Sequence, residues 1–139
     1  MTSRANKITR TSKTRVVYRS LAPDLALLPL TGELRTLLNE DAVKASIKNL
    51  IFTYPGEKFY HPDIGSTVSR DVFEFLDDFT LDRMKETILQ TLQYEPRALN
   101  PRVTFDPQPQ DNYVTVNIFF NLGVVPNQTS QLTIQLRVR

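Results

Sequence analysis

The sequence predicts a small single α+β domain with an N-terminal β-hairpin, three helices and a C-terminal antiparallel sheet. Three observations indicate this class. Two leucine-rich runs flank a Thr-Gly turn near the start, apolar residues recur at helical spacing between residues 39 and 94, and they alternate with polar residues in the last third. A chain of 139 residues supports one hydrophobic core.

Basic residues are concentrated at the N-terminus. Residues 1–15 hold five lysines and arginines and no acid, which leaves 12 basic against 15 acidic residues in the remainder, a net charge of −3. We expect a flexible basic arm over 1–15 and one domain over 16–139. The arm could dock on an acidic surface or nucleic acid, or only keep the protein soluble. Charge confined to an arm argues against a nucleic-acid-binding fold, which carries it on a structured face.

The composition argues against several kinds of site. The absence of cysteine excludes disulfides and thiolate metal ligands, and His61 is the single histidine, so we expect no metal and no cofactor. No apolar run approaches the roughly 18 residues that span a bilayer. The basic N-terminus is not followed by the apolar segment of a signal peptide.

The first half reads as a hairpin, a helix and a stiff loop. Residues 25–30 and 33–38 should pair across Thr31-Gly32, with leucines in the core or an interface, and residues 15–18 could add a short strand. Asn39 is the expected N-cap of a helix that ends by residue 54 and buries Val43, Ile47, Leu50 and Ile51. Residues 55–65, with two glycines and two prolines, predict an ordered recognition loop.

Two more helices are expected before the strands. Ser69 should cap a short one ending at residue 76, and Thr80 a longer one ending at residue 94. Their buried faces, with two aromatic residues plugging the same core, would comprise Val68, Val72, Phe75, Leu76, Leu81, Met84, Ile88, Leu92, Phe73 and Phe79.

Alternating apolar residues predict strands over 102–106, 114–122 and 132–138. Because the last of these runs nearly to the C-terminus, we expect it to be an edge strand that could accept a strand from another chain.

Between helix and strands lies the corner Tyr94-Glu95-Pro96-Arg97. Pro96 ends the helix, and the carboxylate and guanidinium beside it form a fork suited to bidentate contacts with another chain. The alternative is a solvated ion pair at a helix end.

Catalytic signals are weak. A glycosidase acid pair could be drawn from Glu57, Asp63, Glu74 and Glu95, but nothing in their spacing requires it. The sequence also has no nucleophile elbow, phosphate-binding glycine loop or metal cluster, so we expect a protein that is not an enzyme.

Taken together, the motifs resemble the baseplate wedge, or sheath-initiator, family of contractile-tailed phages. This family is also called lysozyme-like, and it has members in type VI secretion and tailocin baseplates. The resemblance covers roughly residues 25–139 and leaves the arm outside. Its matching segments are Thr31-Gly32-Glu33-Leu34, residues 42–50, Pro55-Gly56-Glu57 with Phe59, Pro62-Asp63-Ile64-Gly65, and Tyr94-Glu95-Pro96-Arg97.

The resemblance implies a virion protein of the tail baseplate, assembled in the host cytoplasm, that binds other wedge proteins and the tail sheath. The basic arm could reach the tail tube or hub, and no membrane or small-molecule substrate is implied. A muramidase and a basic-armed nucleic-acid binder are the alternatives. The implied wedge contact comprises Glu95, Pro96 and Arg97 with the loop residues Gly56, Glu57, Phe59, Pro62 and Gly65. The implied sheath-binding strand comprises Leu132, Thr133, Ile134, Gln135, Leu136, Arg137 and Val138.

Overall fold

A computed structural model describes residues 18–73, 77–108, 110–123 and 128–138. In chain order the elements are β1 (Arg19–Leu21), β2 (Thr36–Leu38), α1 (Asn39–Phe52), α2 (Val68–Asp71), α3 (Asp78–Leu92), β3 (Ala98–Gln108), β4 (Tyr113–Leu122) and β5 (Thr129–Arg137). The predicted α+β class, with a hairpin, three helices and an antiparallel sheet, is therefore confirmed. None of the described helices is long and apolar enough to cross a membrane.

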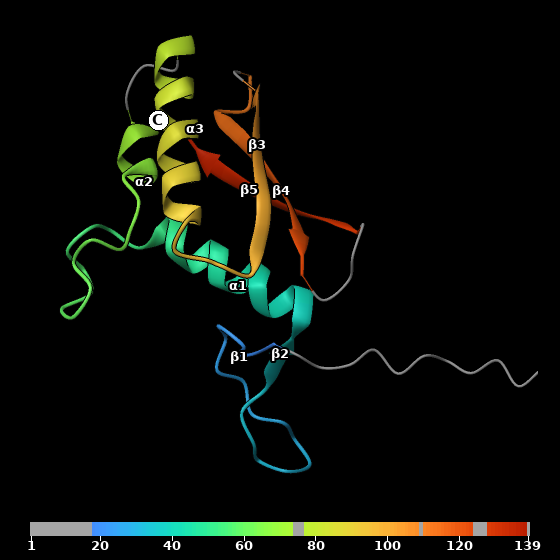
Figure 1. Cartoon of the computed structure of the whole chain (residues 1–139). Helices are drawn as coiled ribbons and strands as arrows, with labels where there is room; N and C mark the ends of the chain where they lie inside the picture. The colour runs from blue at the N-terminus through green and yellow to red at the C-terminus, as the bar shows by residue number, and fades with distance from the viewer. Residues whose placement is uncertain (1–17, 74–76, 109, 124–127, 139) are drawn as a thin grey trace, which may run out of the picture.

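The three-stranded sheet has the order β3-β4-β5, and both pairs are antiparallel. The helices cover one of its faces, with α3 running along β3 (Figure 1). The alternation predicted for β4 is confirmed, because its inward side chains are all at most 6% exposed: Val114, Val116, Ile118, Phe120 and Leu122. The predicted helical faces meet them, and the core includes Val43, Ile47, Val68, Val72, Met84, Ile88 and Leu92.

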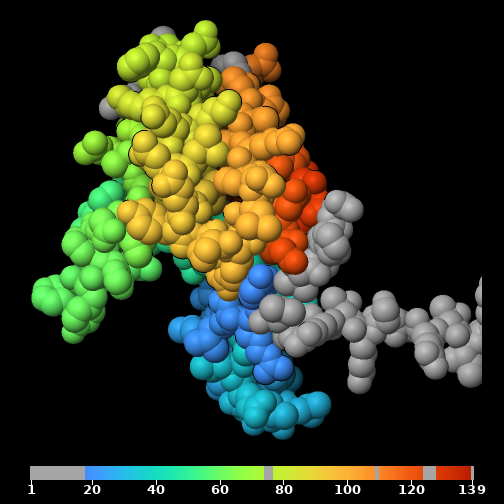
Figure 2. Space-filling model, in the orientation of Figure 1, coloured from blue at the N-terminus to red at the C-terminus, as the bar shows by residue number. Residues whose placement is uncertain are grey.

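The N-terminal hairpin is real but differs from the prediction. The second strand, β2, lies inside the predicted range 33–38, but it pairs with β1, which precedes the predicted range 25–30. The two predicted ranges are joined by an isolated bridge between Leu27 and Leu34. Residues 15–17, part of the short strand expected over 15–18, lie outside the described residues, as does the arm. The hairpin projects from the body beyond α1 (Figures 1 and 2), so a core role for its leucines is wrong. Leu30, for example, is 97% exposed.

All three predicted helix caps are wrong. Leu38 is the N-cap of α1, and Asn39 instead accepts a hydrogen bond from the Tyr18 N–H at 3.2 Å. The N-cap of α2 is Thr67 rather than Ser69. Asp77 caps α3 by accepting from the N–H of Thr80 at 2.7 Å, and this bond lowers the pKa of the Asp77 carboxyl.

Two further differences concern the middle of the chain. The helix α2 ends at Asp71, whereas Phe75 and Leu76 lie outside the described residues. Phe73 and Phe79 are 61% and 73% exposed, so the expectation that they plug the core is wrong. The strand predicted over 102–106 is longer than expected, because β3 runs from Ala98 through Pro107 to Gln108. Within β3, Val103 is buried and Phe105 is half-buried.

Candidate interaction surfaces

The corner after α3 contains a bidentate ion pair. Arg97 Nε donates to Glu95 Oε1 at 2.6 Å, and Arg97 Nη2 donates to Glu95 Oε2 at 2.7 Å. The N–H of Arg97 also approaches Glu95 Oε1 at 3.3 Å, so three donors converge on one carboxylate. Pro96 stands between the two and is exposed. A planar fork matched to a carboxylate is the strong form of such a pair.

The two partners differ in their access to solvent. The Glu95 side chain is 3% exposed, whereas that of Arg97 is 28% exposed. On its other side the guanidinium lies over the ring of Tyr18, with the Arg97 Cζ 5.5 Å from the ring centroid. Sequence reasoning missed Tyr18, because no local pattern links a residue before the hairpin to a corner near position 95.

Burial alone would raise the pKa of the Glu95 carboxyl, but hydrogen bonds from Arg97 and Ser46 outweigh it, and the pKa lies below its ordinary value of 4.5. The hydrogen bond to Glu95 raises the pKa of Arg97 more than partial burial lowers it. Glu95 is therefore a carboxylate at neutral pH, and its charge is compensated within the chain.

This geometry corrects one expectation. The bidentate partner of Arg97 is Glu95 of the same chain, so the prediction that its partner lies on another chain is wrong. The sequence could not decide this, because two residues separated by a proline can point together or apart. That the corner contacts a wedge protein stays a prediction.

The loop between α1 and α2 is closed at its base by hydrogen bonds that backbone N–H groups donate. The N–H of Gly56 donates to the Pro62 carbonyl at 2.8 Å, and Glu57 Oε2 accepts from the N–H of Tyr54 at 2.9 Å. Gly65 has a φ of +147°, and a Cβ there would lie 2.6 Å from Pro55 N. Only glycine fits that position.

Side chains from α3 and the residues after it also hold the loop. Thr91 Oγ1 donates to the Gly65 carbonyl at 3.2 Å, and the Tyr94 hydroxyl donates to Asp63 Oδ2 at 3.3 Å. The negative charge of Asp63 raises the pKa of Tyr94 above its ordinary value. The loop and the corner are thus mechanically connected through α3.

Two aromatic rings occupy the far part of this loop, which stands out from the body in Figure 2 (green). Phe59 and Tyr60 are 89% and 87% exposed, with ring centroids 5.3 Å apart in an edge-to-face arrangement. Exposed aromatic residues on a fixed loop are typical anchors of protein interfaces. Phe59 was predicted as a contact residue, whereas Tyr60 was missed although it is its neighbour in the sequence.

The β5 strand is an edge strand, as predicted. It pairs with β4 on one side, and no described strand pairs with its other side. Its side chains alternate as expected: Ile134 and Leu136 are buried, Leu132 and Val138 half-buried, and Thr133, Gln135 and Arg137 exposed.

The register fixes which backbone groups of β5 are free. The N–H of Val138 donates to the Asn112 carbonyl at 2.8 Å, toward β4. Because successive residues of an antiparallel strand direct their backbone polar groups to opposite sides, Ile134 also directs its own toward β4, where it faces Val116. The groups of Thr133 and Gln135 therefore point to the open edge.

The carboxylates considered for an acid pair are engaged elsewhere. Glu57 accepts from a backbone N–H, Asp63 from a tyrosine hydroxyl, and Glu95 from Arg97, while Glu74 lies outside the described residues. Among the described residues, no three His, Cys, Asp or Glu side chains gather as a metal site requires.

Comparison with known proteins identifies the family. Residues 38–127 match the family described as baseplate wedge protein gp25. The chain belongs to this family. Its curated relative, the baseplate wedge protein gp25 of Enterobacteria phage T4, is 28% identical over 121 residues, which cover 86% of this chain and 91% of the relative.

Solved structures share the fold. A protein from Geobacter sulfurreducens called a tail lysozyme superposes with a TM-score of 0.63 at 22% identity, covering 72% of this chain and 91% of its own. A chain of the anti-feeding prophage baseplate gives 0.60 at 21% identity, with 88% and 86% covered. A chain of the type VI secretion baseplate complex gives 0.56 at 18% identity, with 70% and 91% covered.

Proposed function

We propose that this protein is a structural component of a contractile-tail baseplate wedge. In this proposal the corner and the adjoining loop dock on other wedge proteins, and β5 nucleates the tail sheath by accepting a strand. The family membership supports the baseplate role, since the phage T4 relative is itself a baseplate wedge protein. A type VI secretion or tailocin baseplate is the alternative setting, because related folds occur in both a prophage and a secretion baseplate.

The open edge of β5 is the observation that carries the proposal. One edge of this nine-residue strand offers a row of backbone donors and acceptors that pair with no described strand, and such edges in natural proteins are normally shortened, charged or covered. The side chains that β5 places on the outer face of the sheet are uncharged from residue 129 to residue 135, and Arg137 is the only charged residue of the strand. Strand addition by another chain would satisfy these groups.

The corner contributes shape to the proposed wedge contact. Because Glu95 already neutralises Arg97, a partner does not need to supply a carboxylate to the guanidinium. The ion pair fixes the path of the chain at Pro96, and the contacts of Asp63 and Gly65 hold the base of the loop that carries the aromatic residues. A rigid surface binds with less loss of conformational entropy than a mobile one.

The enzymatic alternative has little support in the carboxylates. A glycosidase general acid needs a raised pKa, whereas the pKa of Glu95 is lowered. We therefore propose a role without catalysis. A cell-wall turbidity assay tests this, and lysis by the purified wild-type chain would contradict it.

The decisive experiment uses particles that carry Gln135→Pro, with Gln135→Ala as the matched control. Proline removes one outward N–H from the open edge while the side chain at that position stays exposed. We expect baseplates that lack sheath in the proline variant and contractile particles in the alanine control. Normal sheathed particles with Gln135→Pro would contradict strand addition.

A second experiment tests the corner by co-purification of tagged protein from cells that produce the particle. The double variant Glu95→Met/Arg97→Met replaces the ion pair with apolar groups of similar volume, a change that is often neutral for folding. We expect it to retain wedge proteins if the corner acts through shape. Loss of those proteins from a folded double variant would instead show that charge is required.

A further inference from the structure

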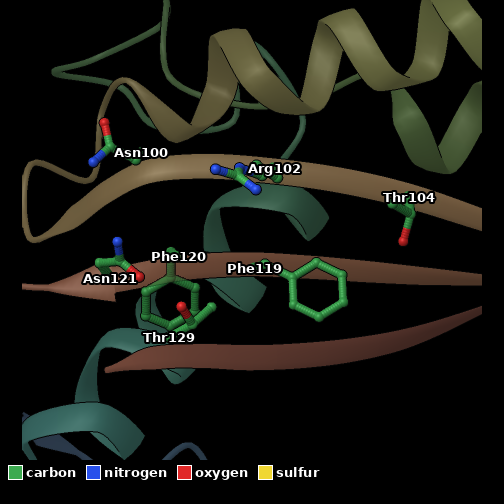
Figure 3. A pocket seen from close by; sticks show the side chains of 7 residues that line it. All are labelled: Asn100, Arg102, Thr104, Phe119, Phe120, Asn121 and Thr129. Atoms are coloured by element: carbon green, nitrogen blue, oxygen red, sulfur yellow. The ribbon is translucent and has the colours of Figure 1, made fainter. Parts of the chain in front are cut away.

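A hollow of about 450 Å³ lies on the outer face of the sheet, opposite the helices. It is formed where β3 has a bulge between Leu99 and Arg102, and where the end of β4 meets the beginning of β5. Figure 3 shows Asn100 and Asn121 at one end of the hollow and Thr104 at the other. The lining consists of Asn100, Arg102, Thr104, Phe119, Phe120, Asn121 and Thr129.

The polar groups in the hollow differ from those beside it on the same face. Further along the sheet, Thr133 Oγ1 donates to Asn117 Oδ1 at 2.8 Å, and Gln131 Nε2 donates to the same oxygen at 3.2 Å. In the hollow, by contrast, the side chains of Asn100, Arg102 and Asn121 make no hydrogen bond or ion pair with any described residue. The hollow therefore holds donors that are available to a ligand.

The chemistry of the lining indicates what would fit. Arg102 is the single charged side chain in it, and its planar guanidinium matches a carboxylate through two parallel hydrogen bonds. Phe119, which pairs with Arg102 across the strands, offers a half-buried ring for an apolar group. The two asparagine amides can pair with a peptide backbone, because each has both donors and an acceptor.

We propose that this hollow binds an acidic peptide segment of a partner protein, with the carboxylate on Arg102, an adjacent apolar side chain on Phe119 and the peptide backbone between the asparagines. Its volume falls within the roughly 300–1,000 Å³ of ordinary ligand sites. The site is separate from the corner and from the open edge of β5, and it does not depend on the function proposed above.

A nucleic acid is the less favoured ligand. Binding to a phosphate backbone draws its affinity from several lysines and arginines together. The hollow has one such residue, and residues 16–139 carry a net charge of −3, which repels a polyanion. A peptide with one or two carboxylates carries less charge, so it is repelled less and its carboxylate can be matched by a single arginine.

The test is an NMR titration of the ¹⁵N-labelled full chain with a blocked tetrapeptide of alternating glutamate and leucine residues. We expect saturable shifts at the amides of Asn100, Arg102 and Asn121. Arg102→Gln should weaken binding by about tenfold, because it removes a charge-assisted bidentate contact. The matched control is Arg137→Gln, an exposed arginine on the same sheet face, which should bind the peptide as the wild type does.

Three results would overturn the proposal. The first is the absence of saturable shifts at the hollow. The second is equal binding of a peptide in which glutamine replaces glutamate, since the carboxylate would then not be recognised. The third is stronger binding of a single-stranded 12-nucleotide DNA at the same amides with the same dependence on Arg102, which would assign the hollow to phosphate. Because no baseplate partner is present, failure here leaves the particle experiments unaffected.

Discussion

The corner and the open edge of β5 are both proposed contact surfaces, yet their polar groups are in opposite states. At the corner, three donors of Arg97 converge on the buried carboxylate of Glu95, so the strongest local interaction is already made within the chain. Along β5, the backbone groups of Thr133 and Gln135 point away from β4 and meet no described strand. The corner can give a partner a fixed shape, whereas the edge can give it hydrogen bonds. Mutations should therefore affect the two surfaces differently.

The sharpest contrast lies within β5 itself. Ile134→Pro should destabilise the isolated protein by about 4 kcal/mol, because it removes a buried side chain and a ladder hydrogen bond to β4. Gln135→Pro, one residue further, should change the free energy of unfolding by less than about 1 kcal/mol. Urea denaturation of both purified variants measures this. Equal destabilisation would show that the backbone N–H of residue 135 does not point to the open edge of β5.

Removal of the Arg97 guanidinium from the corner should lower the stability of the protein. Arg97→Ala leaves the Glu95 carboxylate buried without its partner, and we expect a loss of about 3 kcal/mol, the lower end for a broken buried pair because Arg97 is 28% exposed. The control is Arg35→Ala, whose partner Asp24 is 51% exposed, and it should cost less than about 1 kcal/mol. Similar small losses in both would mean that the corner pair is as dispensable as a surface one.

The conformation of the loop that carries the aromatic residues should depend on Gly65. A Cβ there would lie 2.6 Å from backbone atoms at a φ of +147°, so Gly65→Ala should cost about 2–3 kcal/mol. Gly32→Ala is the matched control, since Gly32 also has a positive φ but open space around it. It should cost about 1 kcal/mol. Thermal unfolding of the two variants compares them, and an equal effect would mean that backbone conformation alone, rather than the close approach, sets the cost.

Acid should weaken the corner before it affects the edge. The folded-state pKa of Glu95 lies below its ordinary value of 4.5, so the stabilisation is fully present above that value. It is then lost as the pH falls through the folded-state pKa. We expect the stability difference between the wild type and Glu95→Met/Arg97→Met to change between pH 7 and pH 3 in favour of the double variant. Parallel urea denaturation at each pH gives the measurement, and a constant difference would contradict the assigned pKa direction.

Patterns that depend on repetition were read correctly from the sequence. The alternation from Val114 to Leu122 predicted both the strand and its buried face, and the helical spacing from Val43 to Ile51 did the same for α1. The N-caps could not be predicted in the same way. Asn39, Ser69 and Thr80 are all of types that favour helix N-termini, but whether such a residue caps a helix depends on which neighbouring groups its side chain binds. Thr80, for example, is a buried residue within α3, because Asp77 is the N-cap of this helix.

The fold class and the main buried faces of the helices and strands could be predicted from the sequence, because both follow from the periodicity of apolar residues. Three features became visible only in the folded chain: Arg97 pairs with Glu95, the hairpin leucines are exposed, and Asn100, Arg102 and Asn121 surround one hollow. Each of these depends on the direction of a side chain relative to segments distant in the chain. Periodicity records which side of an element is apolar, and it contains no information about what lies opposite.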